Sequence, residues 1–285
     1  MKVTLWGTRG SLPSPGPENA RYGGNTPCVE VRGLDGSLLV LDAGTGIRRL
    51  GATVEQELTR VDILLSHLHM DHIQGLGFFE CLERPGLDVH IWGPPSTTHD
   101  LGERIARYLS PPLFPVRLRD LPCDVTLHDT PLGQFEIGNF KLSAGLVSHP
   151  GPTVGYRIEE EGVSIAFLPD HEPALGSENF TVDPAWTSGF ALMSGVDLLI
   201  HDAQYSESEY AEHVGWGHSS IPQALALAEA TNVGRLVLFH HDPGHDDVTL
   251  DRLFEEARRG SDLSFELIPG TEGATFELHR NADVS

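Results

Sequence analysis

The sequence predicts an α/β protein in which two β-sheets pack face to face, with helices on their outer faces, as four layers in one domain. Three observations support this fold class. Short β-rich runs bounded by Gly and Pro dominate the amino-terminal half. Strand-like runs and helical patterns share each half of the chain. The apolar runs, such as residues 38–41 and 198–200, are far shorter than the ~18 residues of a membrane-spanning helix.

The first part of the chain is expected to hold a series of strands and two helices. The helices cover residues 46–58 and 98–109, and Pro111-Pro112 ends the second of them. Glu161-Gly162 is expected to form the turn of a hairpin. The predicted strands cover residues 3–6, 28–31, 38–41, 61–65, 89–92, 140–147, 154–158 and 163–168.

The carboxyl-terminal part is expected to add strand and helix units. The helix over residues 221–231 has Ser219 or Ser220 as a candidate N-cap. The last helix, over residues 248–259, begins with acidic residues, ends with basic ones and has Gly260 as its stop signal. The remaining predicted strands cover residues 197–200, 235–239, 263–267 and 275–278.

No composition shift divides the chain, so a single domain over residues 1–285 is expected. The chain starts without the apolar core of a secretory signal. Its three cysteines, Cys28, Cys81 and Cys123, contain no CxxC pair and are expected to be buried thiols. These features predict a soluble, cytoplasmic protein without a membrane segment or a disulfide framework.

The charge balance disfavours an extended nucleic acid as a partner. Because 41 Asp and Glu face 19 Lys and Arg, the formal net charge is −22, which repels a polyanion unless the few arginines form a patch. Arg9 and Arg21 lie in glycine-rich loops, where either could meet a phosphate, although a loop arginine is usually solvated. A small-molecule substrate is therefore expected, with no nucleic-acid or membrane partner.

Histidines supply the strongest functional signal. His67, His69, Asp71 and His72 directly follow an apolar strand-like run that ends at Leu65. Side chains able to ligate a metal are thus displayed on a loop at the carboxyl end of a strand. A polar turn whose histidines cap the next helix would not need this density of imidazoles beside a carboxylate. The segment therefore predicts a metal site.

This HxHxDH pattern resembles the signature of the metallo-β-lactamase superfamily, whose fold is an αβ/βα sandwich with a metal centre along one edge. The resemblance covers nearly the whole chain, because three further residues of ligand type follow later strand-like runs in the family's order. These are His149, Asp170 and His240.

The resemblance implies two metal sites joined by a bridging carboxylate. Asp71 is expected in addition to help orient the attacking hydroxide. The first ion would be held by His67, His69 and His149, the second by Asp71, His72 and His240, and the bridge would be Asp170.

Two neighbouring positions bear on this ligand set. Strand alternation places His240 and His241 on opposite faces, and the family pattern of an apolar strand followed directly by histidine favours His240. Asp42 resembles the family's aspartate that accepts the free ring N–H of a ligating imidazole. A turn-forming Asp before glycine is an equal alternative for Asp42.

The implied ligands are all nitrogen or oxygen donors, which suits Zn(II) and leaves Mn(II) or Fe(II) open. Two divalent ions, expected to be zinc, are therefore the implied cofactors. Ions ~3.5–4 Å apart lower the pKa of bound water toward neutrality and can take up charge on the attacked centre or the leaving oxygen.

Two further segments resemble the ribonuclease Z-like phosphodiesterase branch of the superfamily. In that branch an acid orients a histidine that protonates the departing oxygen, so the resemblance implies His218 as the general acid and Asp202 as its partner. Asp202 replaces the Glu usual in the branch, which shortens the reach to His218. Otherwise, His218 would be a polar residue flanking a helix and Asp202 part of a strand-end turn.

These residues predict a dinuclear-metal phosphodiesterase that acts on a small phosphodiester of the cyclic or nucleotide type. Relatives that process transfer RNA precursors carry a long Gly/Pro-rich arm between the fourth histidine ligand and the bridging aspartate. Only residues 150–169 separate His149 from Asp170 here, so no such arm fits. Relatives often form dimers, so a homodimer is one expected state.

Two other functions compete with this prediction. A lactone or thioester hydrolase would use the same metal ligands but attack a carbonyl carbon, and it has no need of the pair Asp202 and His218. A non-catalytic metal-binding sensor on the same fold is the second alternative. The intact ligand set and the proton donor make the sensor the weaker of the two.

Overall fold

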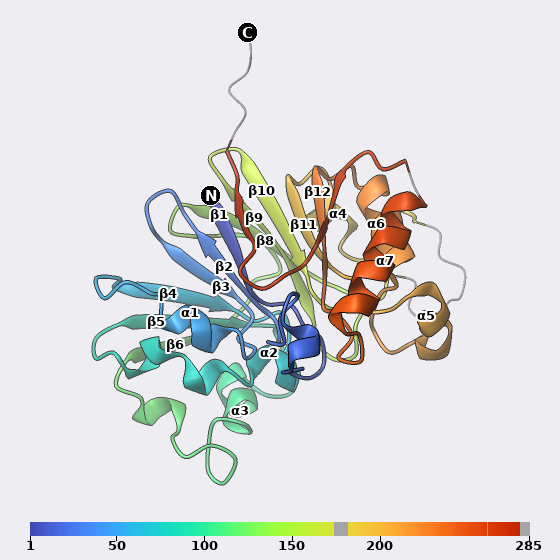
Figure 1. Ribbon diagram of the computed structural model, residues 1–285. Coiled ribbons are helices and arrows are strands. Elements are labelled where there is room, and N and C mark those ends of the chain that lie inside the picture. The colour runs from blue at the N-terminus through green and yellow to red at the C-terminus, as the bar shows by residue number, and fades with distance from the viewer. Residues whose placement is uncertain (174–181, 261, 280–285) are drawn as a thin grey trace.

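The computed structural model describes residues 1–173, 182–260 and 262–279. Two mixed sheets form the body of this part of the chain (Figure 1). The first sheet has the order β14-β1-β2-β3-β4-β5-β6, and the second has the order β13-β12-β11-β10-β9-β8-β7. Each sheet therefore belongs to one half of the chain, except that the last strand returns to the edge of the first sheet.

The bounds of most predicted strands follow the expected apolar runs closely. The first sheet contains β1 (Lys2–Gly7), β2 (Cys28–Arg32), β3 (Leu38–Leu41), β4 (Arg60–Leu64), β5 (Asp88–Gly93), β6 (Asp124–Asp129) and β14 (Thr275–Glu277). The second sheet contains β7 (Gly133–Ile137), β8 (Phe140–Leu146), β9 (Val154–Glu160), β10 (Val163–Leu168), β11 (Leu198–Asp202), β12 (Arg235–Phe239) and β13 (Glu266–Pro269).

Helices cover the outer face of each sheet (Figure 1). The α-helices are α1 (Ile47–Gly51), α2 (Met70–Ile73), α3 (Leu101–Ala106), α4 (Phe190–Met193), α5 (Glu207–His213), α6 (Ile221–Ala230) and α7 (Asp247–Arg259). Short 3-10 helices span Pro17–Asn19, Leu76–Phe78, Glu80–Glu83 and Leu118–Asp120. None of the helices in the described ranges has both the length and the hydropathy needed to cross a bilayer.

The core consists of three apolar layers, which explains why the central strands are buried on both faces. One layer lies between the sheets and contains Phe167 and Phe239. A second packs α1 and α3 against the first sheet, and a third packs α6 and α7 against the second. These layers and the two sheets confirm the predicted α/β sandwich.

Parallel pairing brings the functional strand ends together. Strands β3, β4, β5 and β6 pair in parallel, as do β10, β11, β12 and β13. The carboxyl ends of parallel strands meet at one edge of a sheet, which is where binding sites form in α/β proteins. The hairpin of β9 and β10 turns through Glu161 and Gly162, both with positive φ, as predicted.

Several predicted elements differ in extent. The helix expected over residues 46–58 ends at Gly51, because both the backbone N–H and the hydroxyl of Thr53 bond to the Leu50 carbonyl. The helix expected over 98–109 covers only α3, which Asp100 caps. Strand β13 begins later than predicted. The strands β6 and β7 and the helices α2, α4 and α5 were not predicted.

Candidate active site

The predicted metal ligands meet at the open end of the sandwich, where strands of both sheets terminate. His67 and His69 lie on the loop after β4, and Asp71 and His72 lie in the single turn of α2. From the second sheet, His149 follows β8, Asp170 follows β10 and His240 follows β12 directly. Segments distant in sequence thus converge on one site.

The first cluster is a set of three imidazoles around one carboxylate. Donor atoms of His67, His69, His149 and Asp170 all lie within 4.8 Å of one another. His149 Nε2 is 3.2 Å from His69 Nδ1, and the Nε2 atoms of His67 and His149 are each 3.6 Å from Asp170 Oδ2. The donors are nitrogen and oxygen atoms at the separations that a single ion could bridge.

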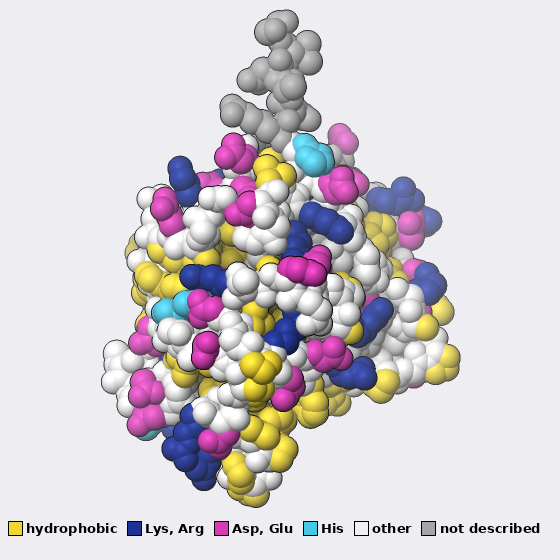
Figure 2. Space-filling view, turned by 90° about the vertical axis from the view of Figure 1, so that its left-hand side faces the viewer, with side chains coloured by type: hydrophobic (Ala, Val, Ile, Leu, Met, Phe, Trp, Pro, Cys, Tyr) yellow, Lys and Arg dark blue, Asp and Glu magenta, His cyan; other side chains and the backbone are white. Residues whose placement is uncertain are grey.

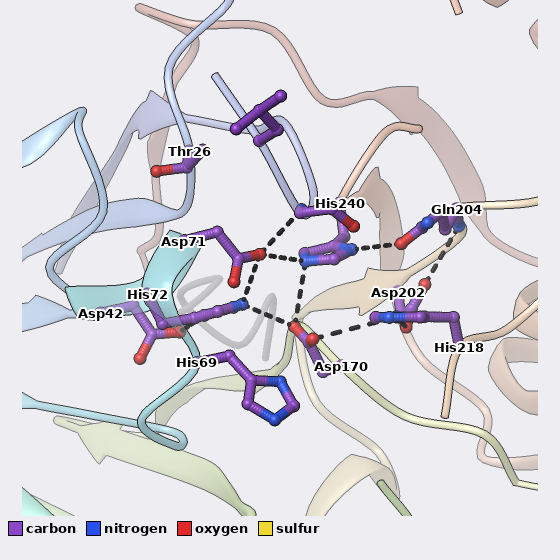
Figure 3. A network of polar contacts seen from close by, with 12 residues as sticks. Thr26, Asp42, His69, Asp71, His72, Asp170, Asp202, Gln204, His218 and His240 are labelled. Carbon is purple, nitrogen blue, oxygen red and sulfur yellow. Dashed lines mark hydrogen bonds and ion pairs between the residues drawn. The ribbon is translucent and has the colours of Figure 1, made fainter. Parts of the chain in front are cut away.

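The second cluster consists of Asp71, His72 and His240 and lies against Asp170 of the first (Figure 3). His72 Nε2 and His240 Nε2 each lie 3.2 Å from Asp71 Oδ2. The same two atoms lie 3.0 and 3.3 Å from Asp170 Oδ1. Asp170 therefore turns one oxygen to each cluster, and it occupies the position that the sequence predicts for the bridging carboxylate.

Hydrogen bonds on the outer ring nitrogens hold these imidazoles in place. His72 Nδ1 is 2.7 Å from Asp42 Oδ2, and His149 Nδ1 is 2.7 Å from the Gly217 carbonyl. His240 Nδ1 is 2.9 Å from Gln204 Oε1. A ring nitrogen that donates its proton to such an acceptor leaves the other nitrogen free as a metal ligand. Asp42 therefore contacts a candidate ligand, as its resemblance to the family's supporting aspartate implies.

Two residues of the site have an unusual backbone conformation. Asp42 and His240 directly follow the apolar strands β3 and β12 and have φ values of +58° and +61°. Asp and His are among the residue types that tolerate this left-handed region best, although the conformation still costs about 1–3 kcal/mol. Such strain at two strand ends that meet in one site is typical of a functional position.

Buried polar atoms that lack a hydrogen-bond partner show whether the residues of the site fit a metal ion. His67 Nε2, His72 Nε2 and Asp170 Oδ1 are buried without a hydrogen-bond partner among the described residues. Buried polar atoms are nearly always satisfied in folded proteins. The three atoms face one another within the two clusters, so the donor set fits divalent ions such as zinc.

Burial and charge set the protonation of these groups. Burial lowers the pKa of His67, His69 and His149, which favours the neutral imidazole that a metal ion requires. Burial opposes the ionisation of Asp170, but the surrounding imidazoles outweigh it and hold its pKa well below its usual range. The imidazoles of the first cluster are thus favoured in the neutral form. Burial also lowers the pKa of His72, but the charges of Asp170, Asp71 and Asp42 outweigh it and raise that pKa.

A histidine–carboxylate pair adjoins the clusters. His218 Nδ1 lies 2.8 Å from Asp202 Oδ2 and 3.8 Å from Asp170 Oδ2, and its ring stacks on His240 with centroids 4.9 Å apart. Burial lowers the pKa of His218, but the charge and the hydrogen bond of Asp202 outweigh burial and raise that pKa to about 9. The 2.8 Å distance shows that Asp202 reaches the imidazole of His218, although its side chain is shorter than that of the Glu usual in the branch.

The other residues that the sequence offered, His241, Arg9 and Arg21, bond to groups outside the clusters. His241 turns away from the clusters, and its Nε2 lies 2.7 Å from the Gly270 carbonyl. Arg9 is fully buried and donates to backbone carbonyls and to Asn19. Arg21 pairs with Asp251 at 2.6 Å. Both arginines therefore have structural partners within the protein.

The sequence did not point to the residues that hold the His218 loop. Glu172 is fully buried, and its carboxylate accepts the backbone N–H groups of Gly215 and Gly217 at 2.8 and 2.7 Å. It thereby fixes the segment that carries both the Gly217 carbonyl and His218. The only signal in the sequence near this loop was the pair of glycines around Trp216. In the structure both adopt positive φ, a conformation that favours glycine.

Comparisons with known proteins agree with this arrangement. The family model described as "Beta-lactamase superfamily domain" matches residues 38–241, which is most of the chain. The ribonuclease Z of Azobacteroides pseudotrichonymphae is 29% identical over 81% of this chain and 86% of its own length.

Solved structures show the same fold at lower sequence identity. The metallo-beta-lactamase fold protein YhfI from Bacillus subtilis has a TM-score of 0.70 at 21% identity, covering 96% of this chain and 98% of YhfI. A diphosphatase from the PhnP family has a TM-score of 0.69 at 19% identity, covering 98% of each chain. The chain therefore belongs to the β-lactamase superfamily and is a metal-dependent hydrolase of the metallo-β-lactamase fold.

Proposed function

We propose that this hydrolase is a dinuclear-metal phosphodiesterase that cleaves a small phosphodiester. The observation that carries the proposal is the contact of His218 with both Asp202 and Asp170, at 2.8 and 3.8 Å. An alkoxide leaving a phosphodiester needs a proton, which His218 is placed to supply, whereas the thiolate that leaves a thioester does not.

The chain's own groups account for the proton transfer. When Nδ1 of His218 donates to Asp202, Nε2 remains to deliver a proton to the leaving oxygen. Asp202 is itself held by the backbone N–H groups of His171 and Gln204, at 3.1 and 3.0 Å. The carboxylate therefore orients the imidazole from a fixed position, and a placed general acid contributes ~10²–10⁴-fold to the rate.

We propose two Zn(II) ions as the cofactors. The first would be held by His67, His69 and His149, the second by Asp71, His72 and His240, with Asp170 between them. The same donors also accept Mn(II) or Fe(II). Bound divalent ions would lower the pKa of water toward neutrality and take up charge on the phosphoryl oxygens. Asp71 also accepts the backbone N–H of Ser11 at 2.8 Å, which fixes the carboxylate proposed to orient the attacking water.

A small substrate is favoured over a folded RNA. The interval between His149 and Asp170 is filled by the short hairpin of β9 and β10, so it holds no long arm. The net charge of −22 also opposes a polyanion. We further propose a cytoplasmic location, which the three buried free cysteines support.

The substrate class can be tested with one panel. Metal-loaded protein is offered bis(p-nitrophenyl) phosphate, a cyclic nucleotide, a precursor transfer RNA, a simple lactone and a thioester. Hydrolysis of the small diesters is expected. Turnover of the lactone or the thioester alone would contradict phosphodiester chemistry, and preferred cleavage of the precursor RNA would instead assign the activity named for the ribonuclease Z relative.

The role of His218 is tested by the leaving group. His218→Ala should slow a diester with an alkyl leaving group by ~10²–10⁴-fold, but slow a nitrophenyl diester far less, because a phenolate leaves without a proton. His279→Ala is the control, since His279 is exposed near the carboxyl terminus. Equal losses on both substrates would count against the proton-donor role.

A further inference from the structure

An apolar pocket adjoins the candidate active site on the side of the first sheet. It is a cavity of about 470 Å³, a size typical of small-molecule sites. One wall is formed by Leu68, Met70 and Ile73, and the facing wall by Tyr108 and Leu113. Met70 and Leu113 are 52% and 70% exposed. Large apolar side chains are therefore left open to solvent beside the metal ligands.

The pocket and the candidate active site share the ligand loop. Leu68 and Met70 directly flank His69, the exposed member of the first cluster. A phosphate held at the clusters would thus lie next to the pocket. In Figure 1, α3 lies below α2, while α5, which precedes the loop of His218, lies to its right. The pocket residues therefore belong to segments of the first sheet, and His218 belongs to a segment of the second.

The outer wall of the pocket is held by packing. Phe114 lies so close to Gly77 that a Cβ there would be 2.4 Å from Phe114 Cζ. Phe114 also contacts Phe78 edge to face, with ring centroids 5.6 Å apart. The Tyr108 hydroxyl donates to the Gln74 carbonyl. The pocket is therefore preformed, which lowers the cost of binding.

The lining chemistry restricts the ligand. Apart from two arginines and Tyr108, whose hydroxyl is already bonded, the lining side chains are apolar. The pocket lining offers no side-chain carboxylate, amide or aliphatic hydroxyl that could pair with the edge of a nucleobase. A polar substituent would lose hydrogen bonds to water there without replacing them. The pocket therefore suits an alkyl or aryl group better than a nucleobase.

Positive charge borders the pocket in an otherwise acidic protein. Arg104 is held by the Pro94 carbonyl at 2.7 Å. Arg107 forms no ion pair or side-chain hydrogen bond with the described residues, although the chain carries a net charge of −22. Figure 2 shows hydrophobic and basic side chains together at the lower end of the molecule, which in Figure 1 is formed by α3 and the segment after it.

We propose that this pocket binds the ester group that stays on the phosphate, that this group is alkyl or aryl, and that Arg107 attracts the anionic diester. The inference rests on the proposed phosphodiesterase function and adds its substrate class. The leaving alcohol departs on the side of His218. The retained ester lies across the loop of His69 in the pocket.

A series of alkyl p-nitrophenyl phosphates, from methyl to hexyl, tests the proposal with metal-loaded protein. Nitrophenolate is the leaving group throughout, so only the retained ester varies. We expect kcat/KM to rise about three- to fourfold for each methylene until the pocket is filled, the factor for burying one methylene completely. A flat series with a hydrolysed methyl member would overturn the inference and leave the phosphodiesterase function standing.

Two variants separate the apolar wall from the charge. Leu113→Ser should flatten the dependence on chain length, whereas Leu132→Ser, at an exposed leucine beyond β6, should keep it. Arg107→Gln should lower kcat/KM by a similar factor for every member and keep the slope. Arg48→Gln, at an exposed arginine of α1, is its control. If kcat/KM still rises steeply with chain length in Leu113→Ser, the pocket is not the site that binds the retained ester.

Binding measurements keep the test informative if no diester is hydrolysed. That outcome would reject the phosphodiesterase function, and calorimetry with methyl and hexyl methylphosphonate would then test the pocket alone. Tighter binding of the hexyl compound, lost in Leu113→Ser, supports the pocket, and equal binding overturns it. If Leu113→Ser instead converts a dimer into a monomer in light scattering, a second copy of the chain covers the pocket and the proposal is wrong.

Discussion

Asp42→Asn would test whether the carboxylate behind His72 sets the tautomer of that imidazole. Asp42 is fully buried. Its Oδ1 accepts the backbone N–H of Ser66 at 2.7 Å, and its Oδ2 accepts the Ser66 hydroxyl at 2.8 Å and lies 2.7 Å from His72 Nδ1. With the ring proton on Nδ1, His72 keeps a lone pair on Nε2, which faces Asp71 and Asp170 and is the form that a metal requires.

Asparagine is the informative replacement because it is nearly isosteric and tolerates the φ of +58° at this position. Its carbonyl can keep the Ser66 N–H bond, but its NH₂ group would face His72 Nδ1 and move the ring proton to Nε2. Loss of such a supporting partner lowers metal affinity about 10–100-fold, or about 1.4–2.7 kcal/mol. Without metal, the substitution should destabilise the fold less, because the proton that moves to His72 Nε2 can be donated to Asp170 Oδ1, 3.0 Å away.

The assay compares melting temperatures with and without added zinc, together with metal content per chain. The rise in melting temperature on zinc addition should shrink in Asp42→Asn, while the chelated variant and the chelated wild type should melt at similar temperatures. Asp62→Asn is the control, because Asp62 is a buried carboxylate of β4 that bonds to Arg60 and Trp92 instead of a candidate ligand. A variant that binds both ions as tightly as the wild type would refute the reasoning.

Asp170→Ala removes the carboxylate shared by the two clusters, so elemental analysis should find less metal per chain, and full occupancy would remove Asp170 from the ligand set. Gly217→Ala would place a Cβ 2.5 Å from His149 Nδ1 at a φ of +93°, so it should destabilise the fold by about 1–3 kcal/mol in urea unfolding. An unchanged midpoint of urea unfolding would show that the loop accommodates the added methyl group without a loss of stability. Burial raises the pKa of Glu209, but the hydrogen bonds from His245 and Ser206 together outweigh it and lower that pKa to about 2. The stabilisation is complete above pH ~4.3 and fades as the pH falls toward 2. Glu209→Gln should therefore lower the melting temperature near neutrality, by less than ~1 kcal/mol in free energy, and by about half as much at pH ~3. An equal loss at both pH values would argue against the ionised carboxylate.

The positions of the predicted ligands could be read from the sequence because each follows an apolar strand. His67, His149, Asp170 and His240 come after runs long enough to be buried strands, and the ends of such strands meet at one edge of a sandwich. The fold class followed from the same runs. His240 was separated from His241 by strand alternation together with the family pattern, and the structure places His240 in the cluster.

The supporting groups could not be read in this way. The Gly217 carbonyl and Gln204 reach their histidines only because loops from separate strands pass beside them, and no local pattern records that path. The buried Glu172 looked like an ordinary acid after a histidine. Helix lengths failed for a similar reason, since tertiary contacts around Thr53 and Gly51 end α1 where helix propensity alone would continue it.

Each ligand cluster takes side chains from both sheets: His67 and His72 come from one, and His149, Asp170 and His240 from the other. A bound ion would therefore tether the two sheets at the end of the sandwich, away from the apolar layer that joins them elsewhere. Removing the ions releases this tether and leaves the buried layer intact. Chelation should thus loosen the mouth first, with faster amide exchange at the strand ends than in the interior.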